Sequence, residues 1–262
     1  MKSIDSDLAP VDVERRFGGL RRLYGDVGFE RLRACHVTVV GVGGVGSWAA
    51  EALARSGVRA LTLIDLDHVA ESNINRQVQA DDRTLGMAKV QALQERIAAI
   101  HPGCAVTPVE SFVEAVNWPL LLPGPVDGLI DACDQVRAKL ALASWALASG
   151  VPTVCVGAAG GKRLAQRVEV ADLSIATHDP LLAALRQRLR KAGAARQGPI
   201  GLRCVFSRES VAAPDADDCS TDGSLNCAGY GSSVAVTATF GFVAAGELMQ
   251  RLSAGRWSAA AR

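Results

Sequence analysis

Four charged residues have the types and spacing expected at a nucleotide-phosphate site. Asp65 ends the apolar segment "LTLID", Arg76 and Lys89 follow it, and Asp134 ends the later segment "IDACD". Two cations that follow one strand can offset the charge of a triphosphate tail, and a carboxylate beside them can hold Mg²⁺. Asp65 is suited to accept a hydrogen bond from a ribose hydroxyl. The set predicts an ATP site in which Arg76, Lys89 and Asp134 carry the chemistry.

A glycine-rich turn is expected to position the phosphates. The turn "GVGGVG" directly follows the apolar run "HVTVV" and has glycines at 41, 43, 44 and 46. Glycines permit a tight turn, close approach of a phosphate and close helix packing, and the helix start favours an anion. NAD, FAD, S-adenosylmethionine and ATP folds share such a turn. The charged residues after it favour ATP, and an NAD-binding oxidoreductase or a nucleotide-binding scaffold is the alternative from another class.

Strands and helices alternate around this turn. Apolar patterns predict strands over 36–43, 60–65, 105–110, 126–134 and 151–158, and helices over 47–56, 86–100 and 138–148. We therefore expect an α/β fold, a doubly wound Rossmann-like and mostly parallel sheet with a C-terminal helical and loop extension. Further on we predict a strand over 166–173, a helix over 179–195, loops over 196–230 and a last apolar helix. The chain divides into a basic helical arm (1–35), the nucleotide-binding fold (36–162) and an extension (163–262) packed on the same domain.

Composition narrows the cellular setting. The net charge of +1 gives no global attraction to nucleic acid or membrane, so any such contact needs a local patch. Seven cysteines without a C-x-x-C pair fit a reducing cytoplasm and offer no zinc-ribbon spacing. The N-terminal segment is charged and lacks an apolar core, so we expect no signal peptide. Residues 223–246 are uncharged and almost long enough to span a bilayer, and their Gly, Ser and Thr content favours a buried helix over a membrane segment.

The motifs together resemble a known family of folds. G-x-G-G-x-G-S, D-x-D-x-V-x-x-S-N-x-N-R-Q, G-x-x-K and D-x-x-D are similar to the adenylating fold of ubiquitin-activating enzymes and of the molybdopterin- and thiamine-pathway adenylyltransferases, over roughly residues 16–160. The resemblance implies attack of a carboxylate on the α-phosphate of ATP, with Mg²⁺, to give an acyl-adenylate. The nucleotide-binding residues it implies, with the glycines of the turn, are Gly41, Gly43, Gly44, Gly46, Asp65, Asp67, Ser72, Asn73, Asn75, Arg76, Lys89, Asp134 and Gln135.

The basic arm gains a role from the same resemblance. Relatives are typically homodimers in which an N-terminal arginine reaches the phosphates of the neighbouring subunit. The matching segment here, "RFGGLRRLYG", departs from the R-Y-x-R-Q form of those relatives. The arginine finger is therefore Arg16, Arg21 or Arg22, and a solvated helix face is the alternative for all three.

The remaining motifs indicate which carboxylate is activated. "RFGGLRRLYG", "GVGSWAAEALARSG", "DACDQVRAK", "THDPLLAALRQRLRK", "CVFS" and "VTATFGFVAA" resemble the tRNA threonylcarbamoyladenosine dehydratase family. The resemblance implies activation of the threonyl carboxylate of the modified adenosine next to the anticodon, cyclisation and net loss of water. The alternative is an adenylyltransferase for the C-terminal carboxylate of a ubiquitin-like sulfur carrier. Its zinc-binding C-x-x-C pairs are absent.

A tRNA substrate needs a basic surface, and the extension offers one. Residues 181–204 contain Arg186, Arg190 and Lys191 among other cations and no acidic residue, although a solvated helix face explains them equally. DNA is not an expected partner. Cys227 in "NCAGYG" matches a family cysteine, so it is either a sulfur-relay thiol, with a cysteine desulfurase or sulfur-acceptor protein as partner, or a plain loop thiol. "GAAGGK" (157–162) lacks a phosphate-loop pattern and is predicted to turn near the substrate carboxylate.

Overall fold

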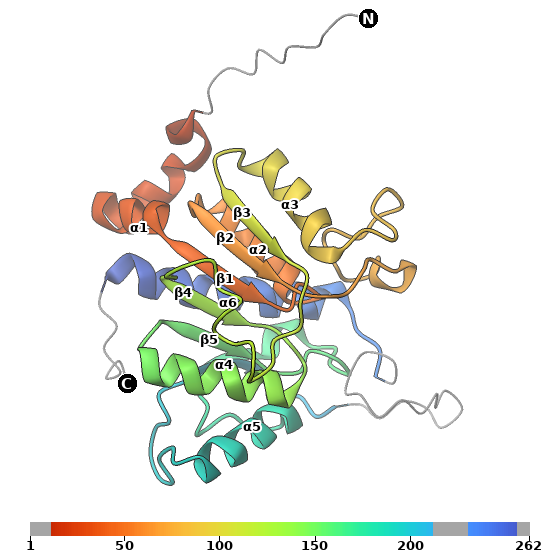
Figure 1. The fold of residues 1–262 in the computed structure, drawn as a ribbon, viewed down its shortest axis with the longest axis vertical. Helices are drawn as coiled ribbons and strands as arrows, with labels where there is room; N and C mark the ends of the chain where they lie inside the picture. Colours follow the sequence, from red (N-terminus) through yellow and green to blue (C-terminus); the bar gives the residue numbers. More distant parts are fainter. Residues whose placement is uncertain (1–11, 212–229, 256–262) are drawn as a thin grey trace, which may run out of the picture.

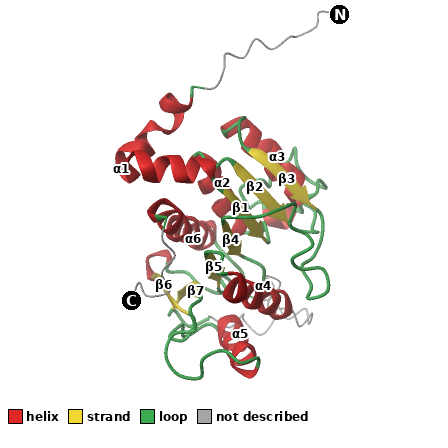
Figure 2. Ribbon diagram, turned by 60° about the vertical axis from the view of Figure 1, so that its left-hand side comes forward, coloured by secondary structure: helices red, strands yellow, loops and turns green. Residues whose placement is uncertain are grey.

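One seven-stranded sheet organises the chain. The computed structural model describes residues 12–211 and 230–255. The strand order is β3-β2-β1-β4-β5-β7-β6, and every neighbouring pair is parallel except β6 with β7 (Figures 1 and 2). The strands are β1 His36–Val40, β2 Ala60–Ile64, β3 Ala105–Val109, β4 Gly128–Asp131, β5 Thr153–Val156, β6 Val168–Asp172 and β7 Arg203–Ser207. The predicted mostly parallel, doubly wound α/β fold is confirmed.

Helices cover both faces of this sheet. They are α1 Val13–Ala34, α2 Gly46–Arg55, α3 Lys89–Ile100, α4 Val136–Ser149, α5 Pro180–Lys191 and α6 Val234–Ala254, with short 3-10 turns at Glu71–Asn73 and Ala165–Arg167. Helix α2 packs against α3 and α6, whereas α4 packs against α5. Figure 2 shows α1 and α6 to one side of the sheet and α4 and α5 to the other. The order of strands reverses between β1 and β4, and ligands of doubly wound sheets bind at that point.

The central strands β1, β2, β4 and β5 are mostly apolar because both of their faces are buried. Val37 and Val39 of β1 belong to the core cluster that contains α2 and α6, together with Phe240 of α6. Val40 belongs to the cluster beneath α4, with Leu142. Every strand residue between the two layers therefore loses water on folding, and this burial is the main favourable term that holds the layers together.

One predicted loop contains a strand. We expected loops over 196–230, but β7 lies within that span and is inserted between β5 and β6. Its burial is almost complete because it pairs on both sides, in parallel register Cys155↔Cys204 with β5 and antiparallel with β6. The Gly- and Ser-rich sequence around "RCVFS" concealed this short apolar run. Residues 212–229 of the span lie outside the described residues.

A second difference concerns the start of α3. The helix was predicted from residue 86 and begins at Lys89. Gly86 has φ +82°, and Ala88 has the extended backbone of an N-cap, so neither can belong to the helix. The remaining predicted elements lie within a few residues of their expected ends, including α2, which Gly57 follows with φ +75°.

The apolar C-terminal helix is part of the core. Val236, Phe240, Ala244 and Leu248 of α6 are buried, and a Cβ at Gly241 would lie 2.9 Å from the backbone nitrogen of Ala49 in α2. This close approach accounts for the small, uncharged residues that the sequence places there. None of the described helices combines the length and apolar character needed to cross a membrane.

Helix α1 lies along the edge of the sheet where the strands begin. It is kinked at Gly25 (φ +71°) and leads directly into β1. Phe17 packs edge-on against His101 after α3, with ring centroids 4.7 Å apart. Arg31 Nη1 donates to the Ser253 carbonyl at the end of α6, at 3.1 Å. These contacts place α1 at the amino ends of the strands, whereas the candidate site lies at their carboxyl ends.

Candidate nucleotide site

A pocket of about 670 Å³ opens at the carboxyl ends of β1, β2, β4 and β5. That volume lies within the range of small-molecule sites. Of the predicted nucleotide-binding residues, all but one line it. They are Gly41, Gly43, Gly44, Asp65, Asp67, Ser72, Asn73, Asn75, Arg76, Lys89, Asp134 and Gln135.

The exception, Gly46, shapes the turn from outside the pocket. A Cβ at Gly46 would overlap the carbonyl oxygen of Gly41, so the residue is needed for packing of the turn on α2. Gly41 has φ +80°, and a Cβ there would lie 2.9 Å from the backbone of Ala132 after β4. The first turn of α2 has no acidic residue and no side-chain cap. The Ser47 N–H in this turn donates to the Gly43 carbonyl at 3.1 Å, and the uncapped helix start favours an anion through its dipole.

Asp65 is held rigidly at the end of β2. Its Oδ2 accepts the Val42 N–H at 2.8 Å, and its Oδ1 accepts the Asp67 N–H at 2.9 Å. Burial raises the pKa of the Asp65 carboxyl above its usual value, although the charge of Lys89 and the two N–H groups oppose the shift. The carboxylate is thus fixed to the glycine turn and faces the pocket, as a ribose-binding acid requires.

Two cations reach the pocket with different neighbours. Lys89 is buried, and its Nζ lies 2.7 Å from Asp67 Oδ2. Arg76 Nη1 donates to the Ser72 carbonyl at 2.6 Å and to Asn75 Oδ1 at 2.8 Å. No carboxylate of the described residues pairs with Arg76. Its charge is therefore available to a ligand.

The two carboxylates of "DACD" have different environments. Asp131 ends β4 and is buried against Lys139 of α4, with Oδ1 3.0 Å from Nζ. Asp134 is exposed, lines the pocket and makes no hydrogen bond within the described ranges. Gln135 is the N-cap residue of α4 and lies beside it. Only Asp134 of the pair can meet a ligand.

Several lining residues were not among those predicted. Phe112 and Val113 follow β3, Leu181 starts α5, and Ser232 and Thr237 border the start of α6. Phe112 is half exposed at the pocket. These residues come from elements far apart in the chain, and no local motif marks them.

The predicted turn after β5 does line the pocket. Gly157, Ala158, Ala159 and Gly160 form one wall. Asp179 holds this wall, because its Oδ2 accepts the Ala158 N–H at 2.8 Å while its Oδ1 caps α5 at the Leu182 N–H, 3.0 Å away. Its position opposite the glycine turn leaves room for a second substrate group beside a nucleotide.

Lys162 at the end of that turn faces the interior. It is buried, and its Nζ donates to the carbonyl oxygens of Ser207 at 2.9 Å and Glu209 at 3.0 Å. It does not line the pocket. This orientation agrees with the rejection of "GAAGGK" as a phosphate loop.

The three arm arginines lie outside the pocket and differ in their contacts. Arg16 Nη1 donates to the Ile100 carbonyl at 2.7 Å. Arg21 forms ion pairs with three carboxylates, at 2.9 to 3.2 Å, and lies over the ring of Phe29. Arg22 is exposed and makes no hydrogen bond or ion pair with any residue that the structure describes. It alone of the three is uncommitted.

The predicted tRNA-binding residues of α5 are placed differently from one another. Arg186 Nη1 donates to the carbonyl oxygens of Leu173 at 3.1 Å and Ala176 at 2.6 Å, so it supports a loop. Arg190 is half-buried, and Lys191 is exposed at the C-terminal end of the helix. The helix begins at the pocket and ends away from it.

The thiol of Cys133 is a poor nucleophile. Cys133 lines the pocket, and burial together with the charge of Asp131 raises its pKa well above the usual value. It lies within the strand that we predicted over 126–134, but β4 ends at Asp131, so Cys133 follows the strand. Cys227 lies outside the described residues.

Comparisons with known proteins show which family this chain belongs to. The ThiF family model matches residues 17–256. The tRNA threonylcarbamoyladenosine dehydratase of Haemophilus influenzae is 40% identical over 251 residues, covering 94% of this chain and 96% of that protein. The Escherichia coli enzyme of the same name is 41% identical over 252 residues, covering 92% and 94%. The crystal structure of the E. coli enzyme in complex with ATP has a TM-score of 0.84 at 40% identity, covering 94% and 97%. The chain therefore belongs to the ThiF family and, within it, to the tRNA threonylcarbamoyladenosine dehydratases.

Proposed function

We propose that the chain uses ATP to dehydrate threonylcarbamoyladenosine next to the tRNA anticodon. The observation that carries the proposal is the pocket itself. It holds an unpaired Arg76 and an unpaired Asp134 at the reversal of strand order, in a fold that matches a dehydratase complexed with ATP over nearly its whole length. No comparable feature of the described residues favours hydride transfer.

Different residues of the pocket bind different parts of the nucleotide. Asp65 accepts hydrogen bonds from the ribose, since its carboxylate is fixed beside the glycine turn. The first turn of α2 receives a phosphate, and Arg76 and Lys89 offset the charge of the tail. Lys89 must exchange part of its contact with Asp67 for the phosphates, so its contribution is smaller than that of Arg76.

Asp134 fits the role of a Mg²⁺ ligand. Its carboxylate is a hard oxygen donor, is exposed and has no competing hydrogen bond in the described chain. Mg²⁺ sites are commonly built from one or two carboxylates plus substrate phosphates, so a dedicated cluster of acidic residues is not required. When bound, the ion would neutralise phosphate charge.

The chemistry follows from a tethered nucleophile. The threonyl carboxylate attacks the α-phosphate, giving an acyl-adenylate and pyrophosphate; a nitrogen of the same side chain then attacks the carbonyl and AMP leaves. The net result is loss of water and ring closure. Because the attacking atom is already in the substrate, proximity supplies the rate and no enzyme nucleophile is needed. The wall of residues 157–160 and the start of α6 flank the space for this carboxylate.

A homodimer would complete the phosphate site. Helix α1 is at the opposite edge of the sheet from the pocket, so Arg22 can reach phosphates only in a second copy. Arg22 is uncommitted, and the nearby Leu23 and Val27 are 72% and 65% exposed. We assign the finger to Arg22. An equimolar mixture of Arg22→Ala and Lys89→Met chains should regain roughly a quarter of the normal activity through mixed dimers. Failure of two inactive variants to complement would contradict the assignment.

The tRNA contact is assigned to the exposed end of α5. Lys191, with the exposed Arg188 and Arg196, offers free charge for phosphates, whereas Arg186 is committed to its loop. A cytoplasmic location, a sulfur-relay role of Cys227 and a sulfur-transfer partner stay predictions from the sequence.

The decisive experiment is nucleoside mass spectrometry after incubation of the protein with modified tRNA and MgATP. We expect a product lighter by one water, with AMP and pyrophosphate released. Asp134→Asn should abolish the reaction, while Asp82→Asn, which alters an exposed carboxylate outside the pocket, should not. No loss of water would refute the tRNA assignment, and ATP–pyrophosphate exchange that depends on a carrier protein would support the adenylyltransferase instead.

A further inference from the structure

The segment that carries Arg76 is tied to the start of α2. Two hydrogen bonds join them: Trp48 Nε1 donates to the Arg76 carbonyl (2.9 Å), and the Val78 N–H donates to Ser47 Oγ (3.4 Å). A third, from Gln79 Nε2 to the Val42 carbonyl (2.9 Å), joins the segment to the glycine turn. Ser47 and Trp48 lie in the first turn of α2, directly after the glycine turn. The cation and the phosphate-binding backbone are therefore built as one unit.

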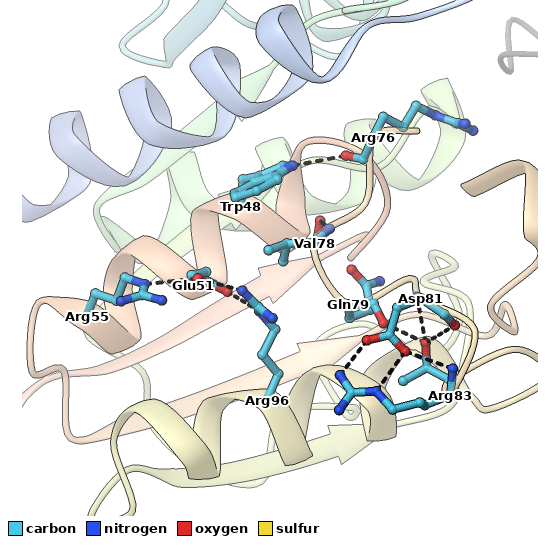
Figure 3. Close-up of polar contacts among 11 residues, drawn as sticks. Trp48, Glu51, Arg55, Arg76, Val78, Gln79, Asp81, Arg83 and Arg96 are labelled. Atoms are coloured by element: carbon cyan, nitrogen blue, oxygen red, sulfur yellow. Dashed lines mark hydrogen bonds and ion pairs between the residues drawn. The ribbon is translucent and has the colours of Figure 1, made fainter. Parts of the chain in front are cut away.

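Of these three hydrogen bonds, the one from Trp48 is made to Arg76 itself, at its backbone carbonyl. The Trp48 indole is half-buried and packs edge-on against Phe242 of α6, with ring centroids 5.6 Å apart and planes at 75°. This contact restricts the direction of the indole N–H. Figure 3 shows the hydrogen bond to the Arg76 carbonyl and the Arg76 side chain extending away from the indole.

The Arg76 side chain has little other support. Its Nη1 bonds only to Ser72 and Asn75, close in sequence, and its stem lies against Gly44, where a Cβ would be 3.3 Å from Arg76 Cγ. An arginine side chain has many rotamers, and holding it in one of them costs entropy. Its direction is therefore sensitive to the orientation of the peptide at its base.

We infer that Trp48 is a positioning residue for the nucleotide site: its indole N–H fixes the Arg76 peptide and so aims the guanidinium at the phosphate tail. Trp48 itself does not line the pocket. The inference rests on the proposed ATP site. Its effect must pass through Arg76 and must depend on the phosphates that Arg76 meets, the β and γ groups.

Trp48→Phe tests this by removing the N–H while keeping an aromatic ring against Phe242. The measured quantity is the ratio of the dissociation constants for ATP and AMP, determined by calorimetry on the full chain. Loss of one hydrogen bond should weaken ATP binding about two- to tenfold and leave AMP binding unchanged. Trp145→Phe is the matched control, because Trp145 also makes an edge-on aromatic contact, with Trp118, and its N–H makes no hydrogen bond within the described residues.

A double-mutant cycle separates positioning from a merely structural role. In the Arg76→Met background, Trp48→Phe should produce no further change in the ATP-to-AMP ratio. The inference would be overturned if Trp48→Phe weakened the binding of ATP and AMP equally. It would also be overturned if Trp48→Phe changed the ATP-to-AMP ratio as much in the Arg76→Met background as in the parent. If Arg76→Met weakens ATP binding but Trp48→Phe does not, only this inference fails. If Arg76→Met leaves ATP binding unchanged, the proposed ATP site fails with it.

Discussion

Replacement of Lys139 by methionine should destabilise the fold strongly. Lys139 of α4 has a side chain with no exposed surface, and its Nζ lies 3.0 Å from Oδ1 of Asp131, which is equally buried. Nζ also donates to the carbonyl oxygen of Val156, at 2.7 Å. Burial alone would lower the pKa of Lys139, but the charge and hydrogen bond of Asp131 together with Cys155 and Cys133 raise the pKa, so the ammonium is retained.

The size of this destabilisation follows from the contacts that Asp131 would keep after the substitution. Methionine keeps most of the aliphatic volume, so the cavity term is small. Asp131 would keep the thiols of Cys133 at 3.0 Å and Cys155 at 3.2 Å and the Cys133 N–H at 3.3 Å, but no positive charge. Removal of one partner of a buried pair costs about 3–5 kcal/mol because the other charge stays buried. That loss is a large part of the stability of a typical domain.

Urea denaturation at neutral pH, followed by circular dichroism, measures this loss. We expect the Lys139→Met chain to lose about 3–5 kcal/mol in free energy of unfolding at an unchanged m-value. The double variant Asp131→Asn/Lys139→Met should recover most of it, because no uncompensated charge remains. A single variant within about 1 kcal/mol of the parent, or a double variant as unstable as the single, would refute the reasoning.

The other predictions concern three further positions. Burial disfavours the charge of Glu51, but hydrogen bonds from Arg96 and Arg55 prevail and lower its pKa (Figure 3). Glu51→Gln should therefore cost about 1–3 kcal/mol of unfolding free energy at neutral pH and little in acid, where the parent also loses this charge. Urea titrations at both pH values measure the difference. Gly46→Ala should abolish ATP binding in calorimetry, because its Cβ displaces the turn. Burial raises the pKa of Asp65, so this carboxylate should begin to take up a proton already in mildly acidic buffer. We expect adenosine, which has no phosphate to titrate, to bind more weakly there. Asp65→Asn should remove that pH dependence.

Local sequence signals predicted the nucleotide half of the fold well. Strands β1, β2, β4 and β5 are continuous apolar runs bounded by glycine or by polar turns, so their pattern required no knowledge of tertiary structure. Strand β7 failed this test, because its apolar run is limited to Cys204, Val205 and Phe206 and the sequence around it contains Gly and Ser. Only its pairing between β5 and β6 stabilises it as a strand.

For the site, too, the sequence predicted some features and missed others. Arg76, Lys89 and Asp134 follow strand ends, and the ends of neighbouring parallel strands meet at one edge, so their proximity was predictable. Burial was not: the two carboxylates of "DACD" look alike in sequence, yet only the packing of Lys139 makes Asp131 structural. Likewise, only the structure separates Arg21, committed to three carboxylates, from the free Arg22.

The charges of the pocket bear on the homodimer and the metal ion that we propose. Among the described residues, its charged lining residues are two cations and three carboxylates, namely Arg76, Lys89, Asp65, Asp67 and Asp134. One cation is already paired with Asp67, so Arg76 is the main free charge that the chain offers to a polyanionic tail. In the proposed reaction, further positive charge would come from outside the pocket, through a metal ion at Asp134 and Arg22 of a second copy. Because leaving pyrophosphate needs that charge most, both sources should act more on turnover than on nucleotide binding.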